Sequence, residues 1–390
     1  MRIGVFTDHF YPELGGIQDS VAELARELGR RGHEVDVWAP RASRADFALA
    51  GLPLGESDLG PRVRVRRVPA VGFPSSSLQS RLASPFFRLH AAAYDVVHVH
   101  SFLGIGRRGL NAAKRLGVPV VGTNHWAVVE FADYVPKSLC GLFRAGSLAY
   151  VSSFYGRCDH VTAPSRLVLD EMAARGLSAP RSTVSNPIDT DVFRPPRAGE
   201  RESARRNLGL SGRVVACIGR IAPEKRTDVV LRAFARLAIG LPDAQLAFAG
   251  HGSFEPRMRA LTRELGVADK VRFLGTLTKP LLASFLRAAD LYAIASVSET
   301  QSMSLLQSFA SGLPAVGVRW RAIPDYLDDD KGRLFERDDE RAMAARMAEL
   351  LGAGPLRRRL GAQARTFAER FSVSAVADSW EAIYRGVRRR

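Results

Sequence analysis

The stretch ADLYAIASVSETQSMSLLQSFASGLPAVGV, residues 289–318, contains the pattern that decides the fold. Its apolar run at 291–294 predicts a buried strand, and residues 304–311 predict a helix that ends near Gly312. A second apolar run, residues 315–318, predicts another strand. A strand, a helix and a second strand in this order are typical of a parallel sheet covered by helices.

The same alternation of short apolar runs and helical patterns extends along the chain in two series. The strands expected in the first series lie at residues 2–7, 35–38, 63–68, 96–100, 118–123 and 160–163. Those expected in the second series lie at residues 214–218, 245–249, 271–273, 291–294 and 315–318. Two such series predict an α/β protein with two doubly wound, Rossmann-like domains that face a cleft. The charged stretch 194–206, near the start of the second series, is expected to be a surface loop or linker.

The composition is that of a globular protein from a reducing compartment. The chain has 390 residues, of which 46% are apolar and 25% charged, and this suits two domains. Three scattered cysteines without a CxxC pair argue against a disulfide framework and against a zinc site. The first residues do not resemble a signal peptide, and no run approaches about 20 apolar residues. We therefore expect a cytoplasmic protein that does not span a bilayer.

The net charge of +16 is unevenly distributed. Residues 61–129 contain ten basic residues and one acidic residue, Asp95, which gives this stretch a net charge of +9. Such a surface attracts the phosphates of nucleic acid or of an anionic membrane. Residues 81–88 add aromatic and basic side chains that could lie at a membrane interface, and an ordinary loop with a surface helix is the alternative. Because no aromatic-basic recognition motif is present, a nucleic-acid partner is not expected.

Ligands of open parallel sheets bind beyond the carboxyl ends of the strands. This rule directs attention to the loops at 8–16, 219–226 and 296–304. In the first loop, Gly15 and Gly16 would let the backbone approach a phosphate or a sugar at the start of a helix, or would form only a tight turn. The two glycines do not make the GxGxxG fingerprint of dinucleotide-binding proteins.

The second and third loops carry the charged candidates. Arg220 and Lys225 could hold a diphosphate as a guanidinium fork and a point charge, and a solvated basic loop is the alternative. Glu299 follows a strand, where it could bind ligand hydroxyl groups. The backbone N–H groups of residues 301–304, which open the next helix, could receive phosphate oxygens, unless they form only a capping arrangement. Gln307 would face the same pocket if the start of this helix points into it.

Three histidines invite a metal interpretation. His98 and His100 share one face of a strand because they are two residues apart. No third ligand follows at a suitable spacing and no HExxH motif is present, so core or surface roles are preferred for this pair. His125 comes directly after a strand and is a better candidate for the cleft. The GxSxG elbow, the P-loop and the kinase motifs are absent, which argues against those classes of enzyme.

Taken together, six segments in order resemble the retaining GT-B glycosyltransferases of family 4, also called group 1. The segments are GGIQDSVAELARELGRRGHEVDVWAP, SNPIDTDVFRP, GRIAPEKRTDVVLRAF, AGHGS, VRFLGTL and the stretch quoted first. They span nearly the whole chain. The resemblance implies a GT-B fold with an acceptor-binding domain, residues 1–186, and a nucleotide-sugar-binding domain, residues 187–371. The final helix of such proteins crosses back to the first domain, which therefore also includes residues 372–390.

The resemblance also implies roles for individual residues. Arg220 and Lys225 would hold the donor diphosphate, and Glu299 would contact hydroxyl groups of the transferred sugar. His125 would lie beside the reacting sugar, and Gln18 near the acceptor. The implied sets are His125, Arg220, Lys225 and Glu299 for catalysis, Gly15, Gly16, Arg220, Lys225, Glu299, Met303, Ser304 and Gln307 for the donor, and Gln18 and His125 for the acceptor.

Two positions depart from the family's pattern. The family has a second glutamate eight residues after the first, which usually accepts bonds from the ribose hydroxyls, and this chain has Gln307 there. An amide oxygen can accept one such bond but lacks the charge and the second oxygen of a carboxylate. Ser302 replaces a glycine, which slightly disfavours the tightest backbone approach to phosphate. We expect weaker ribose binding with function retained, and a catalytically silent sugar-nucleotide-binding module is the alternative.

The function implied by the resemblance is transfer of a hexose from a nucleotide-diphosphate sugar, with UDP favoured and with retention of configuration. The leaving phosphate would take the acceptor proton. Neither a metal nor a cofactor is implied, because Arg220 and Lys225 occupy the role of Mg²⁺. The loop at 298–301, SETQ, is similar to that of diacylglycerol glucosyltransferases. We therefore expect a lipid acceptor such as diacylglycerol and peripheral binding to the inner face of the cell membrane, with a soluble or lipid-linked saccharide as the rival acceptor.

Overall fold

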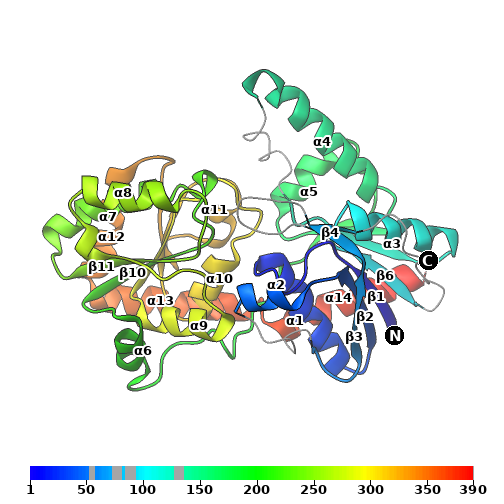
Figure 1. Ribbon diagram of the computed structural model, residues 1–390, viewed down its shortest axis with the longest axis horizontal. Coiled ribbons are helices and arrows are strands. Elements are labelled where there is room, and N and C mark those ends of the chain that lie inside the picture. The colour runs from blue at the N-terminus through cyan, green and yellow to red at the C-terminus, as the bar shows by residue number, and fades with distance from the viewer. Residues whose placement is uncertain (52–57, 73–80, 84–93, 127–135, 390) are drawn as a thin grey trace. The chain divides into compact units, whose positions relative to one another are not determined.

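The chain divides into two compact units, which are drawn in Figure 1. Unit 1 comprises Met1–Pro187 and Val373–Arg390, and unit 2 comprises Ile188–Ser372. The backbone therefore passes from one unit to the other twice. The computed structural model describes all residues except 52–57, 73–80, 84–93, 127–135 and 390.

Unit 1 is built on a parallel sheet of seven strands in the order β3-β2-β1-β6-β7-β8-β9. The strands are β1 (Arg2–Phe6), β2 (Glu34–Pro40), β3 (Val63–Val68), β6 (Val96–Val99), β7 (Val120–Thr123), β8 (His160–Ala163) and β9 (Arg181–Thr183). All residues of β6 and β7 are buried, as expected for central strands covered on both faces. A separate antiparallel pair is formed by β4 (Ala70–Gly72) and β5 (Arg81–Ala83).

Helices cover both faces of this sheet. The helices of unit 1 are α1 (Gly16–Arg30), α2 (Arg44–Leu49), α3 (Gly104–Arg115), α4 (Cys140–Tyr155), α5 (Arg166–Ala173) and α14 (Val373–Arg388). Alternate strand residues enter two different apolar cores, because successive side chains of a strand point to opposite faces. Ile3 and Val5 pack with residues of α1 and α14, whereas Phe6 and Val97 pack with residues of α3, α4 and α5.

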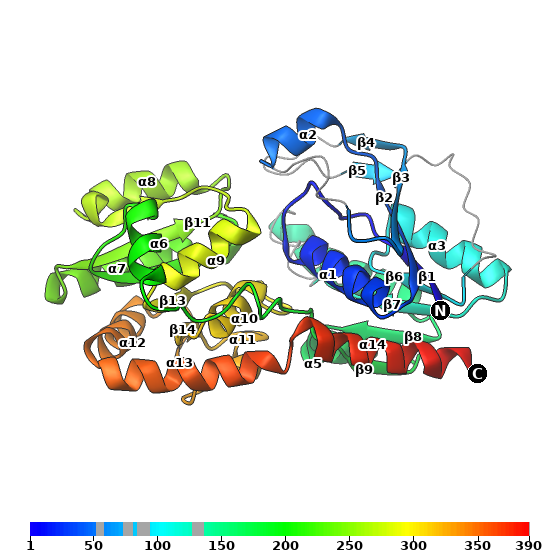
Figure 2. The ribbon, with the colours of Figure 1, turned by 90° about the horizontal axis from the view of Figure 1, so that it is seen from below.

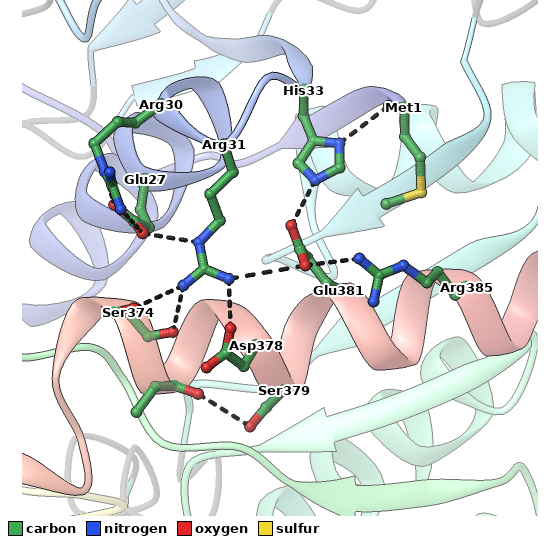
Figure 3. Close-up of polar contacts among 11 residues, drawn as sticks. Met1, Glu27, Arg30, Arg31, His33, Ser374, Asp378, Ser379, Glu381 and Arg385 are labelled. Carbon is green, nitrogen blue, oxygen red and sulfur yellow. Dashed lines mark hydrogen bonds and ion pairs between the residues drawn. The ribbon is translucent and has the colours of Figure 1, made fainter.

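The C-terminal helix α14 packs beside α1, as Figure 2 shows. Its apolar face contributes Trp380 and Tyr384, both buried, to the first of the two cores. A cluster of polar contacts fixes the other side of the helix (Figure 3). Arg31 donates hydrogen bonds to Asp378 at 2.5 Å and to the carbonyl oxygen of Ser374 at 2.8 Å. The helix is thus an integral part of unit 1, although it is the last element of the chain.

Unit 2 is built on a parallel sheet of six strands in the order β12-β11-β10-β13-β14-β15. The strands are β10 (Arg213–Ile218), β11 (Ala244–Ala249), β12 (Val271–Phe273), β13 (Leu291–Ile294), β14 (Ala315–Val318) and β15 (Gly332–Phe335). The helices are α6 (Glu200–Leu208), α7 (Thr227–Gly240), α8 (Glu255–Glu264), α9 (Lys279–Ala288), α10 (Met303–Ala310), α11 (Ile323–Tyr326), α12 (Glu340–Gly352) and α13 (Gly354–Glu369). The predicted α/β class with parallel sheets is confirmed in both units.

The structure also corrects the sequence prediction in several places. The stretch 194–206 was expected to be a loop or linker, but its second half belongs to α6. This helix buries only Ala204 and therefore has no apolar stripe to reveal it. It is favoured instead by acidic residues in its first turn and by arginines in its last turn, which complement the helix dipole. The edge strands β9 and β15 were not predicted, and most of the segment 81–88 lies outside the described residues.

Candidate active site

Three loops of unit 2 meet at the carboxyl ends of β10, β11 and β13. The loop after β10 begins at Gly219, whose amide donates to the carbonyl oxygen of Ala249 at 3.0 Å. The amide of Ile221 donates to the carbonyl oxygen of His251 at 3.1 Å. The amide of Val297, in the loop after β13, donates to the carbonyl oxygen of Glu224 at 3.0 Å. These backbone bonds hold the three loops together as one rim of the sheet.

Two glycines allow this close packing. A Cβ atom on Gly250 would lie 2.0 Å from the carbonyl oxygen of Gly219, and one on Gly252 would lie 2.2 Å from the carbonyl oxygen of Ile221. Gly250 also has a φ of +140°, which other residues rarely adopt. The AGHGS segment is therefore required for the backbone of the rim to close.

A pocket with an empty volume of about 310 Å³ opens at this rim. Its walls include three of the predicted site residues, Arg220, Lys225 and Glu299. Its remaining lining residues are Cys217, Ile218, Gly219, Thr227, Phe248, Ile294, Ala295 and Ser296. The structure thus brings together the charged candidates of the second and third loops.

The charges of the pocket are arranged as two ion pairs. Lys225 Nζ donates to Glu299 Oε1 at 2.7 Å, and both side chains are largely buried. Arg220 Nη2 donates to Glu224 Oε1, with 44% of the arginine side chain exposed. Glu299 is a predicted site residue, whereas Glu224 is not, and Glu224 is not among the lining residues of the pocket. Glu224 is the member of this group that the sequence prediction missed, although it lies four residues after Arg220.

A buried hydroxyl group adds a further polar atom to the pocket wall. Thr227, the first residue of α7, is 3% exposed, and its Oγ1 has no hydrogen-bond partner among the described residues. An unpaired buried polar atom costs about 1–3 kcal/mol. A ligand oxygen in the pocket would remove this cost. The sequence analysis does not include Thr227, whose only signal there is a hydroxyl group two positions after Lys225.

The other donor candidates of unit 2, Met303, Ser304 and Gln307, lie on α10 and are not among the lining residues of the pocket. Ser302 caps this helix, because its Oγ accepts from the amide of Leu305 at 3.3 Å. Ser304 Oγ lies 2.7 Å from the hydroxyl oxygen of Tyr292, and Met303 is the first residue of the helix. Gln307 is 6% exposed, and its amide makes no hydrogen bond within the described part of the chain. Ser302 therefore forms an N-cap of α10, and the side chain of Gln307 takes no part in it.

Gly15 ends the loop after β1 in unit 1, and Gly16 and Gln18 lie in the first turn of α1. Gly15 has an extended backbone, and Gly16 is the first residue of α1. A Cβ atom on Gly15 would lie 2.8 Å from Oε1 of Gln18, which is itself buried. Because this oxygen is the far end of a flexible side chain, the contact alone does not require glycine at position 15.

His125 follows β7 and is 8% exposed. Its Nε2 lies 2.9 Å from Nδ1 of His100, and the two rings are stacked with centroids 5.2 Å apart. Burial lowers the pKa of His125 to about 3, with a further contribution from the charge of His9. At neutral pH, His125 is therefore an uncharged imidazole. His98 and His100 are both buried, which agrees with a core role for this pair and not with a surface role.

His9 is a polar neighbour of this region that the sequence prediction missed. Its ring centroid lies 5.0 Å from that of Trp126. Its Nδ1 lies 3.0 Å from Glu13 Oε2. Burial by itself lowers the pKa of His9, but the hydrogen bond to Glu13 and the charges of Glu13 and Asp8 together raise this pKa above its ordinary value. Because no motif marks His9, only the folded loop could identify it.

Among the described residues, no three histidine, cysteine or acidic side chains are grouped so that they could hold a metal ion. Within the same residues, no helix has the length and apolarity needed to cross a membrane.

Comparison with known proteins gives a consistent result. Residues 14–192 match the model of Glycosyltransferase Family 4, and residues 200–367 match that of Glycosyl transferases group 1. A D-inositol 3-phosphate glycosyltransferase from Acidothermus cellulolyticus is 33% identical, over 96% of this chain and 86% of that protein. An alpha-monoglucosyldiacylglycerol synthase from Streptococcus pneumoniae is 27% identical, over 91% of this chain and 79% of that protein.

Solved structures show the same fold. The Anabaena protein HepE, crystallised with UDP and glucose, superposes with a TM-score of 0.79 at 17% identity, over 99% of this chain and 100% of HepE. A sucrose-phosphate synthase from Thermosynechococcus elongatus has a TM-score of 0.76 at 17% identity, over 99% of each chain. With the GT-B fold, the two matching family models and a 33% identical relative of nearly full length, the chain belongs to the group 1 glycosyltransferases of family 4.

Proposed function

We propose that this glycosyltransferase moves a hexose from a UDP-sugar to a lipid acceptor such as diacylglycerol, at the cytoplasmic surface of the membrane. The observation that carries the donor part is the Lys225–Glu299 pair in the pocket at the carboxyl ends of β10 and β13. A cation and a carboxylate 2.7 Å apart suit a ligand that has phosphate oxygens next to sugar hydroxyls.

In this proposal, Lys225 and Arg220 bind the diphosphate of the donor and stabilise the charge that develops on it as the glycosidic bond breaks. Glu299 accepts hydrogen bonds from hydroxyl groups of the transferred hexose, and Thr227 donates one to a phosphate oxygen. Met303 and Ser304 present backbone N–H groups at the start of α10, and the amide of Gln307 accepts one bond from the ribose.

The reaction proceeds with retention of configuration and without a metal ion. The departing phosphate takes the proton of the acceptor hydroxyl, so the enzyme needs no carboxylate nucleophile of its own. The two cations of the pocket supply the charge stabilisation that Mg²⁺ would otherwise provide. In the same proposal, Gly15 and Gly16 of unit 1 contribute to donor binding, whereas Gln18 and His125 bind the acceptor.

The lipid acceptor is supported by helix α4 and by one relative. Residues 136–158 contain three basic residues and no acidic residue. Within this stretch, the exposed fractions of Leu139, Leu142 and Tyr150 are 50%, 75% and 42%. Exposed apolar side chains next to basic ones suit the interface of an anionic membrane. The name of the pneumococcal relative refers to a glucosylated diacylglycerol, which agrees with a lipid acceptor.

The basic stretch 61–129 contributes less to membrane binding than its net charge suggests. Asp36, on the neighbouring strand β2, lies 2.9 Å from Arg64 and 3.2 Å from Arg66. Asp159 lies 2.9 Å from Lys114. Both acids lie outside the stretch, so they were not counted with it. We therefore assign the membrane contact to α4 rather than to β3.

A soluble acceptor is the second candidate, because the relative at 33% identity is named as a D-inositol 3-phosphate glycosyltransferase. The experiment that separates the candidates supplies the purified chain with UDP- and GDP-sugars. Each donor is offered with anionic vesicles containing diacylglycerol, with a soluble saccharide and with inositol phosphate. Mass spectrometry then identifies the product.

We expect hexose transfer from a UDP-sugar to diacylglycerol. Products formed only on the soluble acceptors would exclude the lipid acceptor. An absence of donor turnover and of hydrolysis with every sugar nucleotide would instead indicate a silent binding module.

A further inference from the structure

His9, in the loop after β1, is held in place through both its backbone and its ring. The hydroxyl of Thr7 accepts from the amide of His9 at 3.1 Å and donates to its carbonyl oxygen at 2.8 Å. Nδ1 of His9 lies 3.0 Å from Glu13 Oε2, and the ring centroid lies 5.0 Å from that of Trp126, in the loop after β7. Because β1 and β7 belong to one parallel sheet, His9 and Trp126 lie at the edge of the sheet where ligands bind.

The contact with Glu13 determines what the outer nitrogen of the His9 ring can do. An ionised carboxylate only accepts hydrogen bonds, so this contact places a proton on Nδ1. Nε2 makes no hydrogen bond within the described part of the chain, and it is not one of the enclosed polar atoms that lack a partner. The side chain is 15% exposed. Nε2 is therefore the polar atom that the ring offers to a ligand, as an N–H donor when the ring is protonated and as a lone pair when it is not.

The surroundings of His9 favour the protonated ring. The titratable groups that face it are Glu13 and Asp8, from its own loop, and His125, from the loop after β7. Burial lowers the pKa of His9, and the hydrogen bond to Glu13 with the charges of Glu13 and Asp8 more than offsets this effect, so that the pKa is raised. His125 does not compete for the proton, because burial lowers its pKa to about 3. His9 thus keeps an N–H group at Nε2 up to a higher pH than an ordinary histidine does.

We propose that Nε2 of His9 donates a hydrogen bond to an ester carbonyl oxygen of the acceptor lipid. This inference rests on the proposed function. Diacylglycerol has a single hydroxyl group, which reacts, and its other polar atoms are ester oxygens, which only accept hydrogen bonds. A protonated imidazole is a charge-assisted donor for such an oxygen. The acceptor class is therefore an acylglycerol, and an ether lipid without carbonyl oxygens is a poorer acceptor.

The test compares diacylglycerol with a dialkylglycerol, which has the same hydroxyl group and no carbonyl oxygen. Both are presented with the UDP-sugar in vesicles of ether-linked phosphatidylglycerol, which carry no ester groups. The readout is the ratio of kcat/KM for the diacyl acceptor to that for the dialkyl acceptor. We expect the unmodified chain to prefer the diacyl acceptor about tenfold, as one hydrogen bond predicts.

Three variants assign this preference to Nε2. His9→Phe keeps a ring beside Trp126 without either nitrogen, and the preference should disappear. His9→Gln places an amide N–H near the position of Nε2 and should keep most of it. His160→Phe, at the amino end of β8 on the opposite edge of the sheet, is the control and should keep the full preference. An equal preference in His9→Phe and in the unmodified chain would overturn the proposal.

The pH dependence gives a second readout. The preference should be lost as the pH rises through the pKa of His9, because the neutral ring keeps its proton on Nδ1 and has only a lone pair at Nε2. Nitrogen NMR of the full chain labelled with ¹⁵N-histidine measures this pKa, and the spectrum of His9→Phe identifies the signals of His9 among those of the eight histidines. A preference that does not follow the measured pKa would contradict the proposal.

The same spectra test the role of Glu13 without any assay of transfer. Glu13→Gln should lower the pKa of His9, because it removes the carboxylate that faces Nδ1. An unchanged pKa would overturn the role of Glu13.

The results also separate this proposal from the proposed function. If the unmodified chain transfers hexose to neither lipid, the proposed function fails and the contact to the ester carbonyl fails with it. If the chain transfers hexose equally well to both lipids, the proposed function is supported and the contact to the ester carbonyl alone is overturned.

Discussion

Lys225 is the residue on which the donor proposal depends most. Replacement by alanine removes the cation from the pocket and leaves Glu299 without its partner at 2.7 Å. We expect Lys225→Ala to lose at least about 2 kcal/mol of transition-state stabilisation. This loss corresponds to about a thirtyfold lower kcat/KM for the sugar nucleotide.

A matched control exists in the same unit. Lys279 forms an ion pair with Asp189 at 2.6 Å, and neither residue lines the pocket. Lys279→Ala should leave kcat/KM nearly unchanged. Equal losses in the two variants would show that the effect at Lys225 is one of stability, and full activity of Lys225→Ala would remove Lys225 from the site.

Gln307 provides the second prediction at the scale of the residue. Its amide is buried and makes no hydrogen bond within the described residues. Gln307→Glu should bind UDP more tightly, because a carboxylate has two acceptor oxygens and a charge for the ribose hydroxyls. Without UDP the same change should lower Tm, since it buries a charge. Titration calorimetry and thermal unfolding with and without UDP measure the two effects, and weaker UDP binding would contradict the ribose assignment.

At the scale of the element, the ionised carboxylate of Glu381 helps to hold α14 in unit 1. Glu381 lies 2.7 Å from His33 Nε2 and 2.8 Å from Arg385 (Figure 3). The hydrogen bond from His33, and the charges of His33 and the nearby arginines, lower the pKa of Glu381. A lowered carboxyl pKa stabilises the fold above the ordinary value of about 4.3, and this stabilisation is lost as the pH falls through the lowered pKa.

Glu381→Gln should therefore destabilise the chain by about 1 kcal/mol at pH 7. The difference from the unmodified chain should decrease as the pH is lowered below about 4. Urea unfolding at several pH values measures this difference. Glu369, whose side chain is 54% exposed beside Arg365, gives the control Glu369→Gln, for which we expect almost no change. A difference for Glu381→Gln that does not depend on pH would contradict the role of its charge.

Helix α4 carries the prediction about the membrane. Leu142→Glu replaces the most exposed leucine of this helix, and Ile239→Glu on α7 of unit 2 is the control at 86% exposure. We expect Leu142→Glu to weaken binding to anionic vesicles at least about tenfold, because burying a leucine contributes about 1.5–3 kcal/mol. Ile239→Glu should bind like the unmodified chain. Co-sedimentation measures both, and equal binding of the two variants would exclude α4 as the membrane contact.

At the scale of the whole molecule, the net charge of +16 makes a prediction of its own. Attraction between exposed charges is screened over about 10 Å at 0.1 M salt and over about 3 Å at 1 M. Binding to anionic vesicles should therefore fall steeply as salt is added, whereas an apolar contribution from α4 should persist. Binding that is insensitive to salt would contradict the electrostatic part of the proposal.

The sequence predicted the parts of the molecule that depend on local pattern. The βαβ order, the parallel sheets and the position of Arg220, Lys225 and Glu299 beyond strand ends follow from apolar periodicity and loop position. Contacts between distant segments were not predictable in this way. The bond between His100 and His125 depends on how β6 and β7 pair, and the neutralisation of Arg64 by Asp36 depends on the pairing of β2 with β3.

The sequence order of the two units has a consequence for folding during synthesis. Unit 2 is one uninterrupted segment, whereas unit 1 lacks α14 until residues 373–388 have been synthesised. Val376, Trp380 and Tyr384 fill the core on one face of the unit 1 sheet. The ribosome therefore releases a finished second unit while that face of the first unit is still open to water. A chaperone that covers this face would have to leave before the last helix can close it.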